Sequence, residues 1–189
     1  MRALTALLLW LALAATVPAA PVPYDLQADD STVAFELDFG PDLIEGRMPV
    51  KRAEIRLDLS RLVNSTVTVT IDAAAATTNN PFATQAMKSP RVLATRAHPE
   101  IRFESTRFTQ TGPAQARVEG RLTIRGVTRE VTLAATLYRQ RGTAQGDLSR
   151  LSVLLEGAVQ RSAFGATGWA GQVGDEVRLR ILARMRRAE

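Results

Sequence analysis

The feature that most constrains the fold is a strict alternation of apolar and polar side chains between Arg117 and Tyr138. One face of each of its two arms is apolar and the other is polar, as a half-buried strand requires. Between the arms lies the sequence Arg-Gly-Val-Thr at 125–128, in which Gly126 can take a positive φ without steric cost. The stretch therefore predicts a long β-hairpin whose apolar face carries Val118, Gly120, Leu122, Ile124, Val131, Leu133, Ala135 and Leu137.

The same alternation recurs along most of the chain. It predicts further strands at 32–39, 43–48, 52–59, 66–72, 101–108, 148–160 and 176–185. Many strands joined by short turns are typical of an antiparallel sandwich or barrel, and about eight strands suffice to close a barrel around one small ligand. From the alternation alone a filled core stays an alternative, because apolar faces ordinarily pack closely.

The segment 73–99 interrupts this pattern. Asn80 is a suitable N-cap and Pro81 fits a first helical turn, so we expect a helix from about Asn80 to Lys88. Phe82 and Met87 would lie on its inner side. Pro90 would start a second short helical piece through Ala94. On a barrel, such an insertion would cover one end of the interior.

Residues 1–19 have the layout of a cleaved secretory signal. A basic start at Arg2 precedes an apolar run from Leu4 to Val17 and a small-residue ending, with the cut expected after Ala19. A retained membrane anchor is the alternative, although the run is short of the roughly 20 apolar residues that span a bilayer. We therefore expect one domain over 20–189 in the periplasm. The chain has no cysteine, so disulfides and thiolate chemistry are excluded.

The sequence offers little for catalysis or metal binding. His98 is the only histidine, so neither a histidine-based nucleophilic triad with a matching motif nor a histidine metal cluster is predicted. We expect no catalytic residues, no metal and no cofactor. A carboxylate-only enzyme site remains the alternative, because such a pair leaves no motif.

The charge is basic but interleaved. The formal net charge is +5, and most arginines sit at polar strand positions beside Glu, which indicates a solvated strand face. We expect no nucleic-acid partner, because no stacking-aromatic motif accompanies the charge. Outward positions of Arg, Glu and Thr also argue against an outer-membrane barrel.

Four stretches of the chain carry a resemblance to a known family. They are the Tyr24-Asp25-Leu26 start followed by Ser31-Thr32-Val33-Ala34-Phe35, the stretch from Met87-Lys88-Ser89-Pro90 through His98-Pro99-Glu100-Ile101-Arg102-Phe103-Glu104-Ser105, the signature Gly120-Arg121-Leu122-Thr123-Ile124-Arg125-Gly126-Val127-Thr128, and Arg161-Ser162-Ala163-Phe164-Gly165 with Gly174-Asp175-Glu176-Val177. In this order they resemble the YceI-like family of exported polyisoprenoid-binding proteins. Where that family often has histidines in its opening strand, this chain has Asp30 and Asp38-Phe39-Gly40.

The resemblance implies an all-β fold, an extended antiparallel lipocalin-like β-barrel with a short helical cover and a long apolar tunnel. It implies an isoprenoid lipid as ligand, either an isoprenoid quinone or a polyprenyl phosphate, which is sequestered or carried without catalysis. We expect the tunnel to be lined by Phe35, Leu37, Val69, Phe82, Met87, Phe103, Leu122, Leu133, Val153, Leu155 and Leu179. At its mouth we expect Phe164 and Trp169, with Arg161 as either a polar contact for the head group or a structural arginine.

Two partner questions stay open from the sequence. Trp169 is expected either to plug the barrel end or to lie at a membrane surface, as amphipathic indoles do, and in the second case it would make transient membrane contact. A homodimer is neither required nor excluded. The alternative function is an exported, stress-related structural or interaction module with a filled core, which would bind partners through its arginine-rich strand faces.

Overall fold

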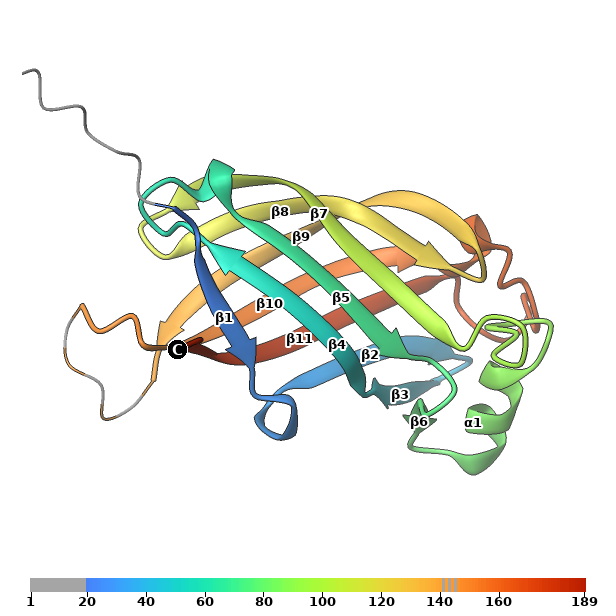
Figure 1. Ribbon diagram of the computed structural model, residues 1–189. Coiled ribbons are helices and arrows are strands. Elements are labelled where there is room, and N and C mark those ends of the chain that lie inside the picture. Colours follow the sequence, from blue (N-terminus) through green and yellow to red (C-terminus); the bar gives the residue numbers. More distant parts are fainter. Residues whose placement is uncertain (1–19, 141, 143, 145) are drawn as a thin grey trace, which may run out of the picture.

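The computed structural model describes residues 20–140, 142, 144 and 146–189. The expected signal segment, 1–19, lies outside the described residues. The described chain is an 11-stranded antiparallel sheet with one α-helix and three short 3₁₀ turns (Figure 1). Its strands are β1 Val22–Leu26, β2 Thr32–Phe39, β3 Asp42–Met48, β4 Val50–Leu57, β5 Thr66–Asp72, β6 Thr77–Thr78, β7 Glu100–Gly112, β8 Gln115–Ile124, β9 Val127–Arg139, β10 Arg150–Gln160 and β11 Glu176–Arg187. The helix is α1 Pro81–Lys88, and the turns are η1 Ala28–Asp30, η2 Leu62–Asn64 and η3 Arg161–Phe164.

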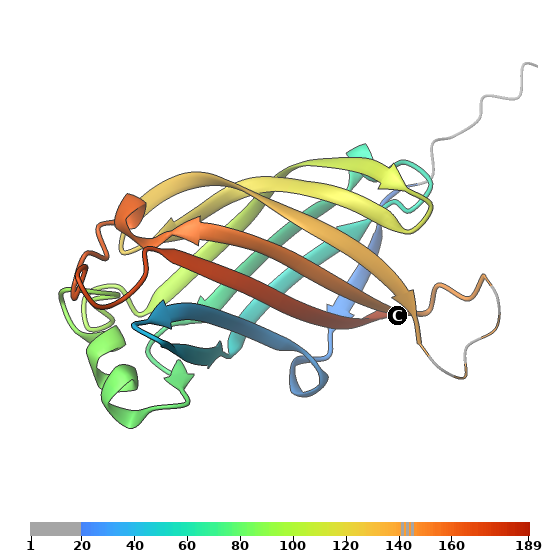
Figure 2. The same ribbon diagram turned by 180° about the vertical axis from the view of Figure 1, so that it is seen from behind.

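Eight of these strands close into a ring in the order β1-β4-β5-β7-β8-β9-β10-β11, with β11 pairing back to β1. The long strands cross the body obliquely and leave no free edge within the ring (Figures 1 and 2). Closure satisfies the backbone donors and acceptors that an open sheet would expose. The fold is therefore the closed antiparallel barrel expected from the sequence.

The remaining strands, β2, β3 and β6, extend the barrel at one end. The strand β11 pairs with β1 through Met185–Arg187 and with β2 through Arg178–Leu182, so the sheet forks along its length. On the outer face of this fork Arg178 donates to Glu36 at 2.7 Å and to Asp38 at 2.8 Å. The guanidinium lowers the pKa of Asp38, which shows that the charged form of this carboxyl is favoured at the seam.

The central hairpin is confirmed, with a shorter turn than the sequence suggested. Ile124 pairs directly with Val127, so Val127 and Thr128 belong to β9 and only two residues form the turn. Arg125 and Gly126 have φ values of 54° and 75°. Two consecutive positive values identify the primed turn that matches the twist of a β-hairpin.

The insertion between β5 and β7 covers one end of the barrel, as Figure 1 shows. Asn80 caps α1 by accepting from the backbone N–H groups of Phe82 and Ala83. The expectation of a second helical piece from Pro90 to Ala94 is wrong, because these residues form turns held by local backbone hydrogen bonds. Within the described residues, no helix is long and apolar enough to cross a membrane.

Candidate binding site: an apolar tunnel through the barrel

The interior of the barrel is hollow. A single cavity of about 910 Å³ runs along it, which lies within the range of small-molecule binding sites. At one end its wall includes α1 and the loop after η3, and at the other end it includes Leu62 of η2 and the β7–β8 connection. The alternative of a filled core, which the alternation of side chains also allowed, is therefore not what this chain forms. We call this cavity the tunnel.

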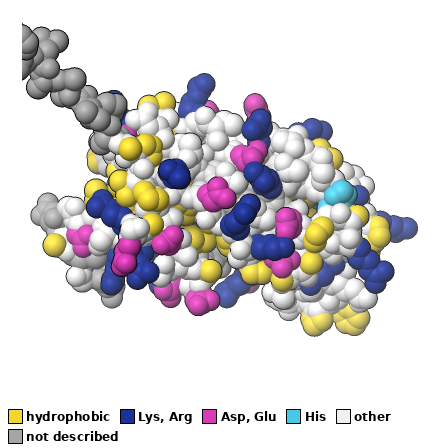
Figure 3. Space-filling view, viewed as in Figure 1, with side chains coloured by type: hydrophobic (Ala, Val, Ile, Leu, Met, Phe, Trp, Pro, Cys, Tyr) yellow, Lys and Arg dark blue, Asp and Glu magenta, His cyan; other side chains and the backbone are white. Residues whose placement is uncertain are grey.

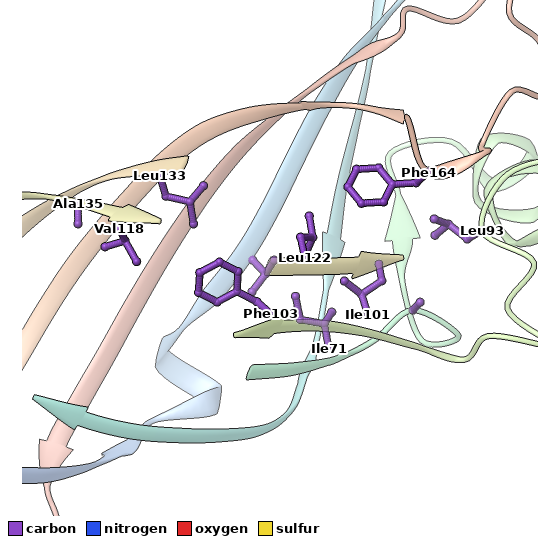
Figure 4. Close-up of a cluster of buried hydrophobic side chains, with 11 residues drawn as sticks. Ile71, Leu93, Ile101, Phe103, Val118, Leu122, Leu133, Ala135 and Phe164 are labelled. Carbon is purple, nitrogen blue, oxygen red and sulfur yellow. The ribbon is translucent and has the colours of Figure 1, made fainter. Parts of the chain in front are cut away.

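All of the tunnel residues expected from the sequence lie on its wall: Phe35, Leu37, Val69, Phe82, Met87, Phe103, Leu122, Leu133, Val153, Leu155 and Leu179. Figure 4 shows part of this lining, with Leu133, Val118 and Ala135 toward one side and Phe164 and Leu93 toward the other. Alternation predicted the nine strand residues among them, because every second side chain of a barrel strand points inward, and Phe82 and Met87 were expected from the helix. Their contact with a ligand stays a prediction.

Two phenylalanine rings lie directly against glycines of neighbouring strands. A Cβ on Gly46 would lie 2.1 Å from Cζ of Phe35, and one on Gly120 would lie 2.5 Å from Cζ of Phe103. A contact below 3.0 Å is one that real Cβ atoms essentially never make. The glycines thus leave room for bulky rings along the wall, and this arrangement helps to keep the tunnel open.

The α1 end of the tunnel carries a rim of exposed apolar side chains. Phe82 is 83% exposed, and Phe39, Leu43 and Trp169 are between 41% and 45% exposed. Phe39, Phe82 and Trp169 also line the tunnel. Phe82 lines the tunnel as expected, but its ring is largely exposed to solvent, because α1 lies at the margin of the opening. Met87, one turn further, is half-buried and packs against the core.

Arg161 is a buried structural arginine. Its guanidinium donates to the carbonyl oxygens of Ala166 (2.5 Å), Gly168 (2.8 Å), Gly174 (2.8 Å) and Val173 (3.0 Å). Its side chain thereby fixes the loop that follows η3, including Trp169. Of the two roles left open by the sequence, the geometry favours the structural one, since most of its N–H donors are already used. Phe164 is only 2% exposed and belongs to the main core cluster.

The described residues contain no cluster of three or more His, Asp or Glu side chains that could hold a metal ion. The most constrained carboxyl is Asp58, which is 5% exposed and sits in the β4–β5 connection. It accepts from the hydroxyl of Ser60, the amide of Asn64 and the backbone N–H of Arg61, and these bonds lower its pKa to about 2. Such a carboxyl orders a turn and stays ionised.

The polar outer face is consistent with a solvated surface. Basic and acidic side chains alternate across the strands (Figure 3), and ion pairs such as Arg102–Glu104 and Arg121–Glu104 join neighbours. Pairs this exposed contribute about 0–1 kcal/mol each. They indicate solubility of this face and do not by themselves form a site.

A closed antiparallel barrel around a continuous apolar cavity defines this molecule as a hollow-barrel binding protein. The YceI-like domain family matches residues 24–185. The chain belongs to this family, which confirms the resemblance expected from its sequence.

Curated relatives agree with the family assignment. The chain is 33% identical over 115 residues to a UPF0312 protein of Serratia proteamaculans, covering 61% of this chain and 59% of that protein. It is 25% identical over 132 residues to a UPF0312 protein of Vibrio parahaemolyticus, covering 69% and 70% of the two chains. The match to the Serratia protein thus spans less than two thirds of its length.

Solved structures share the fold. Burkholderia cenocepacia BcnA superposes with a TM-score of 0.76 at 19% identity, over 85% of this chain and 99% of that one. The YceI protein of Campylobacter jejuni superposes with a TM-score of 0.63 at 21% identity, over 75% and 85%. At these identities the likeness concerns the barrel architecture alone.

Proposed function

We propose that this protein sequesters or carries an isoprenoid lipid, an isoprenoid quinone or a polyprenyl phosphate, in the tunnel, without catalysing a reaction on it. The observation that carries the proposal is the predominantly apolar lining of a cavity of about 910 Å³. A long, slender prenyl chain fits an elongated cavity better than a compact ligand does. Each buried methylene of such a chain would contribute roughly 0.8 kcal/mol.

The exposed apolar rim at the α1 end supports a route by which lipid enters the tunnel from a membrane. Phe82 and Trp169 are exposed and also line the tunnel, so a lipid entering between them would pass from a membrane surface into the barrel without crossing water. We propose transient contact between this rim and a membrane, with the protein working in the periplasm after removal of residues 1–19. A homodimer is not needed for this scheme, because one chain encloses the whole tunnel.

The first test is native mass spectrometry of the protein purified from its own exported fraction, followed by organic extraction. We expect a bound prenyl species in near-stoichiometric amount. Protein that is empty, and that also refuses quinones and polyprenyl phosphates offered in detergent, would contradict the proposal.

A variant test uses two positions on opposite faces of β10. Val153 lines the tunnel, whereas Ala158 is exposed and does not. Val153→Glu should abolish lipid uptake, because an unpaired carboxylate in an apolar cavity is costly. Ala158→Glu, which adds the same charge to the same strand, should bind like the wild type. Val153→Glu protein that folds and still binds with unchanged affinity would exclude the tunnel as the site.

A further inference from the structure

The segments that close the α1 end differ in charge from the rest of the molecule. Residues 73–99, 125–128 and 161–174 contain five cationic side chains, Lys88, Arg91, Arg96, Arg125 and Arg161, and no Asp or Glu. On the strand faces, by contrast, arginines such as Arg121 and Arg178 pair with carboxylates. None of the five cations forms an ion pair with any described residue. These segments therefore place cations without ion-pair partners around the mouth of the tunnel.

Two of these cations line a polar recess beside the mouth. The recess is formed by Pro90, Arg91, Arg125, Gly165, Thr167, Gly168 and Trp169. Gly168 and Trp169 also line the tunnel, so the two spaces share a wall. A molecule with its tail in the tunnel could place a polar head in the recess by passing this wall.

Arg125 is held in place by backbone carbonyls alone. From the two-residue turn of the β8–β9 hairpin its Nη1 donates to the carbonyl oxygen of Gly165, and its Nη2 donates to that of Pro90 at 3.0 Å. These contacts fix the guanidinium but leave its charge without a counterion, and three of its five N–H donors remain available.

Arg91 and Thr167 complete the recess as free donors. In the described part of the chain neither side chain makes a hydrogen bond or ion pair. The backbone of Arg91 is fixed, because its carbonyl oxygen accepts from Gly168 N–H at 2.9 Å. Three acidic side chains lie near this end: Asp38, which Arg178 already binds, the exposed Asp42, and Asp175, which accepts from the backbone N–H and the hydroxyl of Ser162 and interacts electrostatically with Arg161. None of the three lines the recess.

Two guanidinium groups and a hydroxyl around one recess are suited to a tetrahedral oxyanion, because arginine's planar fork matches phosphate oxygens. We propose that Arg91, Arg125 and Thr167 bind a phosphate group at the mouth, as the head of a lipid whose tail occupies the tunnel. The proposal rests on the proposed function for the tail. It assigns charge recognition to Arg91 and Arg125 in place of Arg161, whose donors are committed to carbonyls.

The test compares two ligands that differ only in the head group, farnesyl phosphate and farnesol, on protein freed of lipid. Trp169 is the only tryptophan in residues 20–189, so its fluorescence reports binding from the recess itself. We expect farnesyl phosphate to bind at least about tenfold more tightly than farnesol, since charge-assisted hydrogen bonds from guanidinium groups to phosphate are stronger than neutral ones. Arg91→Gln should remove most of this preference and leave the farnesol affinity unchanged.

The matched control is Arg96→Gln, which removes the same charge from the same loop but does not line the recess. It should keep the preference. Arg125→Gln is a second test variant, whose folding is checked by circular dichroism because it also loses two carbonyl contacts. Inorganic phosphate, added alone and with farnesol, tests whether the recess binds free phosphate or the phosphate of a lipid head group. A change in Trp169 fluorescence with inorganic phosphate, without a preference for farnesyl phosphate over farnesol, would identify a site for free phosphate.

Equal affinities of wild-type protein for the two lipids, with no response to inorganic phosphate, would overturn the anion site while leaving the lipid-binding function intact. An equal loss of preference in Arg96→Gln and Arg91→Gln would also overturn it, because the effect would then be diffuse charge. Failure to bind either lipid would instead count against the proposed function.

Discussion

The ring of Phe35 lies so close to Gly46 on the neighbouring strand that a methyl group there would come within 2.1 Å of Cζ of Phe35. Gly46→Ala must therefore push the ring out of its place on the wall and toward the tunnel. We expect a loss of stability of about 1–3 kcal/mol, as for other overpacked sites. Uptake should also fall more for long prenyl chains than for short ones, because the displaced ring of Phe35 would narrow the tunnel in the variant.

Urea unfolding and a series of prenyl alcohols of increasing length check this prediction. Gly171→Ala is the control, because a Cβ at Gly171 meets nothing within 4 Å. The double variant Gly46→Ala with Phe35→Leu should recover part of the lost stability. If Gly46→Ala matched the wild type in both measurements, the glycine would not be what holds the ring against the wall.

The carboxyl of Asp58 should make stability depend on pH in the acid range. Its pKa in the folded protein is lowered to about 2, below the ordinary value of 3.8. The stabilisation is fully present above the pKa of the unfolded chain and is lost as the pH falls toward about 2. Asp58→Asn should be less stable than the wild type at pH 7, and the two should converge near pH 2.

Thermal unfolding between pH 2 and pH 7 measures this difference. Asp42→Asn changes an exposed carboxyl of the β2–β3 hairpin and should leave the curve almost unchanged. A constant gap between wild type and Asp58→Asn over the whole range would show that hydrogen bonds to the ionised carboxyl are not the cause.

Arg161 should be more important for holding the loop that follows η3 in place than for binding a charged head group. Arg161→Lys keeps the cation but cannot reproduce four hydrogen bonds to carbonyls spread from Ala166 to Gly174. We expect a loss of about 2–4 kcal/mol in unfolding free energy and faster hydrogen exchange across 162–174. The ratio of farnesyl phosphate to farnesol affinity should stay as in the wild type. A selective loss of the phosphate preference would instead place Arg161 at the head group.

The sequence predicted the barrel and its lining well because both depend on local alternation. Leu133 and Val153 point inward for the simple reason that every second residue of a strand does so. The sequence could not predict that the sheet forks at β11, because the pairing of this strand with both β1 and β2 depends on contacts between segments far apart in the chain. The recess was missed for the same reason: Arg91 and Arg125 are 34 positions apart and meet only when the hairpin turn reaches the cap. The exposure of Phe82 was not predicted, because the spacing of apolar residues shows which side chains share a face of a short helix but not whether another part of the protein covers that face.

The exposed ring of Phe82 should speed transfer of lipid from membranes without contributing much to equilibrium binding. It is 83% exposed at the mouth, so burying it in a bilayer surface would remove apolar area from water during docking. Phe82→Ser should slow uptake of a prenyl lipid from vesicles several-fold, while the affinity for ligand presented in detergent stays close to that of the wild type.

Val63 provides the control, because it is 73% exposed in η2 at the other end of the barrel. Val63→Ser removes a similarly exposed apolar side chain and should not change the transfer rate. Vesicles containing anionic lipid should load the protein faster than neutral ones, since Lys88, Arg91 and Arg96 belong to the segment that covers this end of the barrel (Figure 1). Added salt should reduce that difference. Equal slowing by Phe82→Ser and Val63→Ser would show that uptake does not proceed through the α1 end.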